Sequence, residues 1–133
     1  MASGKINRYI GYEAHGSYTP TIVAGPGVTG FTFNNAEAIY IKFGKLLLLS
    51  VRFNITNLGS GTENLVIFLP TGIKTNSNVN SGKGGCGSCS RQYFYPMYNT
   101  GENYIYIVKE GGNPSLPSIG TGFISVFAIV VID

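Results

Sequence analysis

Two cysteines, Cys86 and Cys89, are the residues of this sequence whose type and spacing point most directly to chemistry. A Cys-x-x-Cys pair catalyses thiol–disulfide exchange when it stands at the start of a helix inside a βαβ unit. The sequence predicts neither a helix nor such a unit around this pair, which lies in the stretch GGCGSCSRQYFYP. We therefore expect no redox catalysis.

Zinc binding and a disulfide are the two other roles open to this pair. A structural zinc site needs four ligands, usually from two such pairs, so the pair and His15 suffice only if several copies of the chain pool their cysteines. In a strand, Cα atoms three residues apart are separated by roughly 10 Å, and a disulfide allows about 7 Å. A bridge would therefore require a turn at Gly87-Ser88. We expect two reduced thiols, no metal and no cofactor.

The acidic residues form no recognisable catalytic motif. They are Glu13, Glu37, Glu63, Glu102, Glu110 and Asp133. All fall in predicted loops or at strand ends, whereas a glycosidase needs two carboxylates facing one bond. The sequence also contains no G-x-S-x-G, no H-E-x-x-H and no phosphate-binding loop. A pair of carboxylates contributed by two different subunits stays open. We predict that the protein is not an enzyme.

The composition is typical of an all-β domain with many tight turns. Among 133 residues there are 19 glycines, 9 tyrosines and 8 phenylalanines, a balance that favours strands over helices. The length fits one domain with a substantial core. We predict that residues 1–17 are a leader or the remnant of a linker, and that residues 18–133 form the domain.

Alternation of apolar and polar residues predicts the individual strands. Residues 38–43 and 46–56 are expected to form a hairpin with a turn at Gly44-Lys45. One face of the second strand is apolar throughout: Leu47, Leu49, Val51, Phe53 and Ile55. Further strands are predicted at about 64–69, 89–98, with an interruption at Pro96, and 104–108.

Two strands are apolar on faces that a single sandwich would leave polar. The last strand, Phe123–Ile132, is apolar on both faces, and Leu46 and Leu48 make the outer face of 46–56 apolar at its start. Arg52 lies where that outer face becomes polar. Either the last strand is central in a thick core, or another copy of the chain covers it. The low charged fraction of 11% suits a buried surface, and we predict a homo-oligomer.

Charge and hydropathy argue against two classes of partner. The net charge of +3 comes from 9 Lys and Arg spread along the chain, whereas nucleic-acid binding favours a basic patch or stripe. No stretch reaches the roughly 20 apolar residues of a membrane span, and the polar start does not resemble a secretory signal. We expect no nucleic acid, no membrane insertion, and synthesis in the cytoplasm.

Four short elements follow one another in a characteristic order. They are Tyr18-Thr19-Pro20-Thr21, Phe43-Gly44 before Leu46–Ile55, Gly59-Ser60-Gly61 before Leu65–Pro70, and the closing strand Phe123–Ile132. This order resembles the C-terminal head domains of receptor-binding proteins, tail fibres and baseplate appendages of tailed bacteriophages. The sequence departs from that group in lacking a tryptophan, and Thr71–Pro117 has no counterpart there.

The resemblance implies a trimeric, jelly-roll-like antiparallel β-sandwich at the tip of a phage tail or on its baseplate. Such a chain is made in the host cytoplasm, joins the virion beside other tail proteins, and binds a saccharide of the bacterial cell wall or surface. The alternative is a structural virion appendage, a trimer that caps a fibre or decorates a capsid without binding a ligand.

The strand at 89–98 offers the side chains best suited to a saccharide. Tyr93 and Tyr95 share one face of that strand, and a tyrosine ring combines an apolar body with a polar tip. Arg91 has the same parity, and its guanidinium presents several hydrogen-bond donors. We predict a carbohydrate-binding site composed of Arg91, Tyr93, Tyr95, Tyr98 and Asn99. The alternative is that these tyrosines only cover a sheet edge.

Overall fold

The computed structural model describes residues 12–25, 28–60, 65–77, 82–83, 85–89, 92–109 and 121–133. For residues 12–13, 82–83, 85–89, 92–95 and 108–109 the description covers the backbone only. The strands are β1 (Tyr12–Tyr18), β2 (Ile22–Ala24), β3 (Thr32–Phe43), β4 (Leu46–Asn57), β5 (Leu65–Phe68), β6 (Gly82–Lys83), β7 (Gly85–Cys89), β8 (Gln92–Tyr98), β9 (Tyr104–Lys109) and β10 (Gly122–Val131). Within this described part, no helix is long and apolar enough to cross a membrane.

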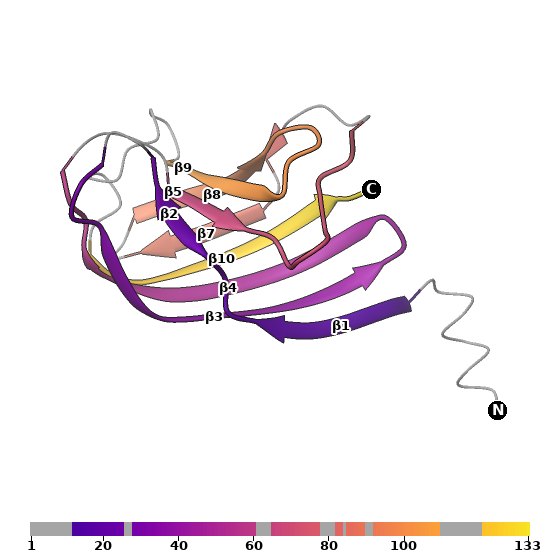
Figure 1. The fold of residues 1–133 in the computed structure, drawn as a ribbon, viewed down its shortest axis with the longest axis horizontal. Coiled ribbons are helices and arrows are strands. Elements are labelled where there is room, and N and C mark those ends of the chain that lie inside the picture. The colour runs from indigo at the N-terminus through magenta and orange to yellow at the C-terminus, as the bar shows by residue number, and fades with distance from the viewer. Residues whose placement is uncertain are drawn as a thin grey trace.

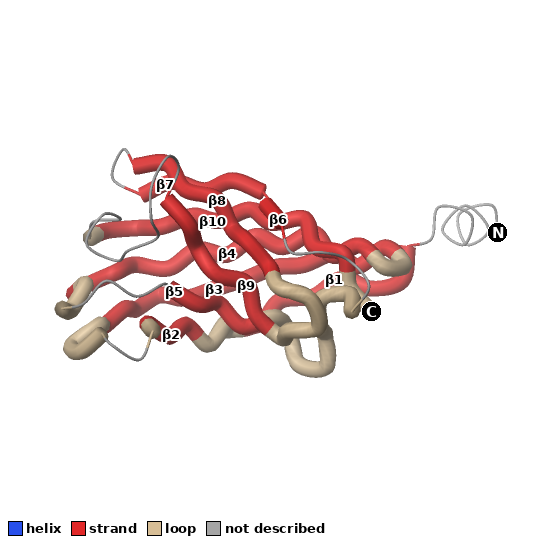
Figure 2. The backbone as a smooth tube through the Cα atoms, turned by 90° about the horizontal axis from the view of Figure 1, so that it is seen from above, coloured by secondary structure: helices blue, strands red, loops and turns tan. Residues whose placement is uncertain are grey.

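The strands form one continuous sheet in the order β1-β3-β4-β10-β7-β8-β9-β5-β2, and β6 pairs with β8. All pairs between these strands are antiparallel. The sheet bends over so that β1, β3, β4 and β10 form one layer and β2, β5, β8 and β9 lie across from it (Figures 1 and 2). The prediction of an all-β antiparallel sandwich is confirmed, and the trimer stays a prediction.

The core lies between the two layers and follows the predicted alternation. From β4 it receives Leu47, Leu49, Val51, Phe53 and Ile55, and from β10 Ile124, Val126, Ala128 and Val130. The opposite layer contributes Leu65, Ile67, Ile105 and Ile107. All of these side chains are buried, because every second residue of a strand points to the same face of the sheet.

The predicted hairpin is present, with Phe43 paired to Leu46 across the turn Gly44-Lys45. Gly44 has a φ of 54°, a left-handed conformation that glycine adopts without a steric penalty. β3 begins earlier than expected, at Thr32, and it contains a bulge between Asn34 and Glu37. Phe31 lies just before this long strand, and Asn34 lies near its start.

The first strand begins before the domain boundary that the sequence predicts. Residues 12–17 were expected in a leader, but β1 pairs with β3 from Tyr12 onward and forms an edge of the sheet. At Gly16 the ring of Tyr40 occupies the space of a side chain, since an added Cβ would lie 3.0 Å from the Tyr40 Oη. A glycine in a polar segment weakens the strand signal, whereas here it permits the pairing.

Pro96 does not interrupt β8. Proline lacks the backbone N–H that a neighbouring strand would use. On one side of β8, the described pairs with β7 end at Phe94, and those with β6 begin at Met97. Pro96 lies between these two sets of pairs.

Tyr18 connects the two layers. Its hydroxyl donates a hydrogen bond of 2.9 Å to the carbonyl oxygen of Phe68 in β5. Its ring packs edge-on against Tyr40, with 6.1 Å between the centroids. Burial, followed by the nearby Tyr40, raises the pKa of the Tyr18 hydroxyl, which remains protonated at neutral pH.

Candidate functional site

The outer face of β3, β4 and β10 carries most of the exposed large apolar side chains in the described residues. On this face the exposed apolar side chains are Ile39, Ile41, Leu46, Phe123, Phe127 and Ile129. Another exposed apolar side chain, Val23, lies on β2. Ile39 is 63% exposed and Phe123 is 47% exposed. In the described part of the chain this side of β10 stays exposed, which argues against the thick-core explanation for its two apolar faces. The homo-oligomer remains the prediction.

Cross-strand register orders these side chains into rows. Ile41 of β3 pairs with Leu48 of β4, which pairs with Ile129 of β10. Directly opposed residues in a sheet point to the same face and contact one another. The next row contains Ile39, Ser50 and Phe127. We call Ile39, Ile41, Leu46, Leu48, Phe127 and Ile129 the apolar half of the outer face.

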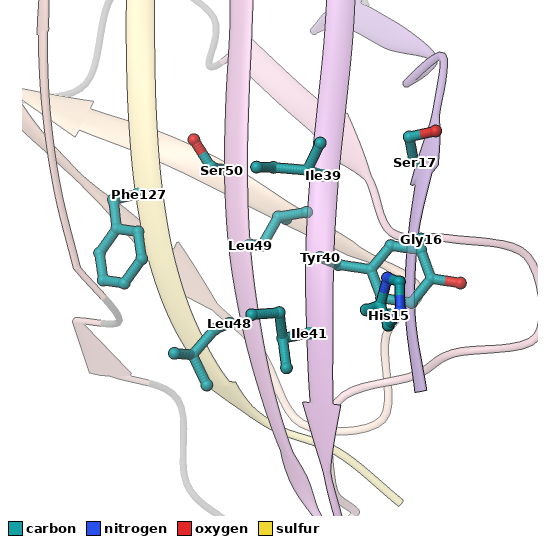
Figure 3. A pocket seen from close by; sticks show the side chains of 10 residues that line it. All are labelled: His15, Gly16, Ser17, Ile39, Tyr40, Ile41, Leu48, Leu49, Ser50 and Phe127. Atoms are coloured by element: carbon teal, nitrogen blue, oxygen red, sulfur yellow. The ribbon is translucent and has the colours of Figure 1, made fainter. Parts of the chain in front are cut away.

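A shallow depression of about 630 Å³ lies over the apolar half. Ile39, Ile41, Leu48 and Phe127 line it, and His15 and Ser17 of β1 border it (Figure 3). The aliphatic and phenyl groups at its floor offer dispersion contacts and few hydrogen-bond partners. Such a surface suits another apolar surface better than it suits a hydroxyl-rich ligand.

The following rows of the same face are polar. Glu37 of β3 pairs with Arg52 of β4, which pairs with Ser125 of β10. The guanidinium carbon of Arg52 lies 4.3 Å from the centroid of the Phe123 ring, a cation–π contact. We call Glu37, Arg52, Phe123 and Ser125, together with the bulge residue Asn35, the polar half of the outer face.

Two depressions flank the Glu37–Arg52 pair. One, of about 690 Å³, extends toward the apolar half and is also bordered by Ser17, Ile39, Ser50 and Ser125. The other, of about 300 Å³, is lined by Asn35, Ala36, Glu37, Arg52 and Phe123. The polar half is therefore hollowed on both sides of two opposite charges, and it combines an aromatic ring with donors and acceptors.

The predicted carbohydrate site on β8 is described only in part. Tyr93 and Tyr95 lie in β8, paired with Ser88 of β7 and Val108 of β9. The side chains of Tyr93 and Tyr95 and all of Arg91 lie outside the described residues. This site stays a prediction.

Its other two members lie where β8 ends. Tyr98 is half-buried and packs against the core. The Asn99 carbonyl accepts a hydrogen bond from the hydroxyl of the buried Thr75, and its side-chain oxygen accepts one of 3.5 Å from Tyr106. Both residues therefore have a structural role, whether or not they also contact a ligand.

The two cysteines lie in β7, an extended strand in which Cys86 pairs with Phe127 and Cys89 with Ile124. The turn at Gly87-Ser88 that a disulfide requires is not formed. Among the side chains that are described, no three His, Cys, Asp or Glu residues gather as a metal site would need. The cysteine side chains themselves lie outside that description.

Comparison with known proteins finds a similar fold in a solved structure. The chain is similar to a solved structure titled "Crystal structure of Dettilon tailspike protein (gp208)", with a TM-score of 0.62 and 20% sequence identity. The match covers 90% of this chain but only 24% of the tailspike chain. No family model matches the sequence, and no curated protein matches it. At this identity the likeness establishes the fold alone.

Proposed function

We propose that this chain is a head domain of a tailed-bacteriophage tail protein that recognises a saccharide on the bacterial surface. The observation that carries the proposal is the match of 90% of the chain to part of a tailspike. The order of Tyr18-Thr19-Pro20-Thr21, the hairpin and the last strand supports it independently. In this proposal the protein resides at the tail tip or baseplate of the virion, in contact with other tail proteins.

The proposed assembly is a homotrimer joined through the apolar half of the outer face. This surface contains exposed aliphatic and phenyl groups in adjacent rows, and each Å² of apolar area removed from water contributes about 25 cal/mol. A second copy supplies a surface of the same chemistry. Identical subunits favour closed symmetry, and three copies agree with the phage-head resemblance.

The proposed activity is binding without cleavage. The test uses the purified full chain on a panel of bacterial strains and on an array of purified bacterial surface polysaccharides. We expect binding to some strains, loss of binding after periodate oxidation of their surface sugars, and no release of reducing ends from the bound polysaccharide. Release of reducing ends would instead identify an enzyme.

The second candidate function is a structural appendage that caps a fibre or decorates a capsid. The uncharged apolar half favours it, since that surface suits protein packing. A folded trimer that binds neither the strains nor the array, and that instead binds a purified tail or capsid protein, would overturn the receptor-binding proposal in favour of this one.

A further inference from the structure

We propose that the polar half of the outer face is a saccharide-binding site, with Arg52, Glu37 and Phe123 as its principal contacts. The inference rests on the proposed function and gives its ligand a location. This location is separate from the site that the sequence predicts on β8. It lies on β3, β4 and β10, next to the apolar half.

Arg52 has donors to offer to a ligand. Its guanidinium contacts the Phe123 ring at 4.3 Å and forms no hydrogen bond or ion pair with the described residues. A cation–π contact uses the positive charge of the guanidinium, while hydrogen bonding uses its N–H groups. The ring thus holds the long side chain in place and leaves its hydrogen-bonding capacity to a ligand that has hydroxyl or carboxylate oxygens.

Glu37 offers the complementary acceptors. It is exposed and directly opposite Arg52 in the sheet, yet the two form no ion pair among the described residues. A carboxylate can accept hydrogen bonds from two sugar hydroxyls. Donor and acceptor groups in adjacent strand positions suit a ligand that presents neighbouring hydroxyls, as sugars do.

Phe123 adds an apolar surface at the same place. Its ring is 47% exposed, and it lines the same depression as Asn35 and Glu37. The C–H faces of sugars pack on aromatic rings, while their hydroxyls require polar partners. The polar half therefore supplies an aromatic ring and polar side chains at neighbouring positions of the sheet.

The pairing of β3 with β4 is irregular at two places, between Thr32 and Phe33 near the end of β4 and between Asn34 and Glu37 at this site. The register shifts between Asn34 and Glu37, and Asn35 has a φ of 53°. A left-handed residue other than glycine costs free energy, and bulges commonly redirect side chains near functional sites. The side-chain hydrogen bond of 3.0 Å from Asn54 to Asn34 stabilises the bulge next to the depression.

The two depressions on either side of the Glu37–Arg52 pair indicate an extended ligand. They share Glu37 and Arg52 as lining residues, so a chain of several sugars can pass from one depression to the other across the pair. A nucleic acid fits less well, because the Glu37 carboxylate would repel its phosphates. An apolar partner fits less well, because it would bury two charges without hydrogen bonds.

The experiment measures binding of the full-length chain to a polysaccharide that is positive on the array, for the wild type and six variants. Two of them, Tyr93→Ala and Tyr95→Ala, probe the site predicted on β8. Arg52→Ala and Arg52→Lys test the guanidinium, and Glu37→Gln tests the carboxylate. Lys45→Ala is the control. It also removes one exposed positive charge, but Lys45 lies in the turn of the β3–β4 hairpin, away from the polar half. Arg52→Lys keeps a cation above Phe123, so it remains informative if Arg52→Ala does not fold.

We expect Arg52→Ala and Arg52→Lys to weaken binding about tenfold or more, Glu37→Gln to weaken it severalfold, and Lys45→Ala to bind like the wild type. If the Arg52 and Glu37 variants bind like the wild type, the inference is wrong and the receptor-binding function stands. If these variants retain binding while Tyr93→Ala or Tyr95→Ala loses it, the site is on β8. If the folded wild type binds no strain and no polysaccharide, the proposed function fails, and the inference fails with it.

Discussion

Arg52 of β4 lies over the ring of Phe123 of β10, with 4.3 Å between the guanidinium carbon and the ring centroid. The contact stands next to the boundary between two chemically different parts of one sheet face. On one side, rows such as Ile41, Leu48 and Ile129 are apolar. On the other, Glu37 and Arg52 are charged and exposed. The two halves therefore suit different partners, a copy of the chain and a sugar.

Replacing Ile39 by Asp should convert a trimer to monomers. Ile39 is 63% exposed in the isolated chain, so the charge disturbs the folded monomer little but would be buried without a partner in the interface. Light scattering should give a wild-type mass near three times 14.2 kDa. Val23→Asp is the control, because Val23 is also apolar and exposed but lies on β2. A monomeric wild type would refute the interface.

Tyr18→Phe should lower the free energy of unfolding by about 1 kcal/mol. The variant keeps the ring that packs on Tyr40 and removes the hydroxyl that donates to the Phe68 carbonyl across the layers. Urea unfolding followed by circular dichroism measures the difference. An unchanged midpoint would mean that the hydrogen bond adds nothing to the contact between the layers.

The same hydroxyl should make the wild type sensitive to alkali. Burial raises the pKa of Tyr18 in the folded state. The stabilisation that the protonated hydroxyl contributes is therefore fully present at pH values below about 10, the pKa of an unfolded tyrosine, and it is lost as the pH rises further. Above that pH, the unfolded chain releases a proton that the folded chain retains. The stability of the wild type should fall faster above about pH 10 than that of Tyr18→Phe. Parallel curves for the two proteins would contradict this assignment.

Gly59→Ala should be far more damaging than Gly72→Ala, although both glycines have a positive φ, of 71° and 85°. A Cβ at Gly59 would lie 2.3 Å from the Thr29 carbonyl oxygen, whereas at Gly72 nothing lies within 4 Å. We expect a loss of about 3 kcal/mol or more at Gly59 and about 1 kcal/mol at Gly72. Thermal unfolding measures the loss of stability in each variant. Equal losses would show that the positive φ, and not the contact with the Thr29 carbonyl oxygen, determines the cost.

Cys86 and Cys89 should both be free thiols. The extended backbone of β7 separates their Cα atoms by more than a disulfide allows. Thiol titration of the denatured, unreduced protein should therefore detect both. A mass 2 Da below that of the reduced chain, with no reactive thiol, would show that the bridge forms.

Most of β4, β5, β9 and β10, the β3–β4 hairpin and the inner face of the sheet could be predicted from the sequence. Each depends on a local pattern: the period-two alternation from Leu47 to Ile55, or the glycine between two apolar runs. The apolar outer face was also visible, because Leu46, Leu48 and Phe127 break the alternation expected of a solvated sheet. Local patterns failed at β1 and at Pro96, where pairing with distant strands, and not intrinsic preference, decides whether a segment is extended.

What the sequence by itself determined is which side chains each strand sends to each face, because that depends on residues one and two positions apart. Apart from the β3–β4 hairpin, only the tertiary structure decided which strands are neighbours and in which register. Arg52 and Phe123 meet because β10 pairs with β4, and Asn34 lies opposite Asn54 because the bulge at Asn35 shifts the start of β3. Such contacts depend on backbone hydrogen bonds between distant segments, which no spacing along the chain specifies.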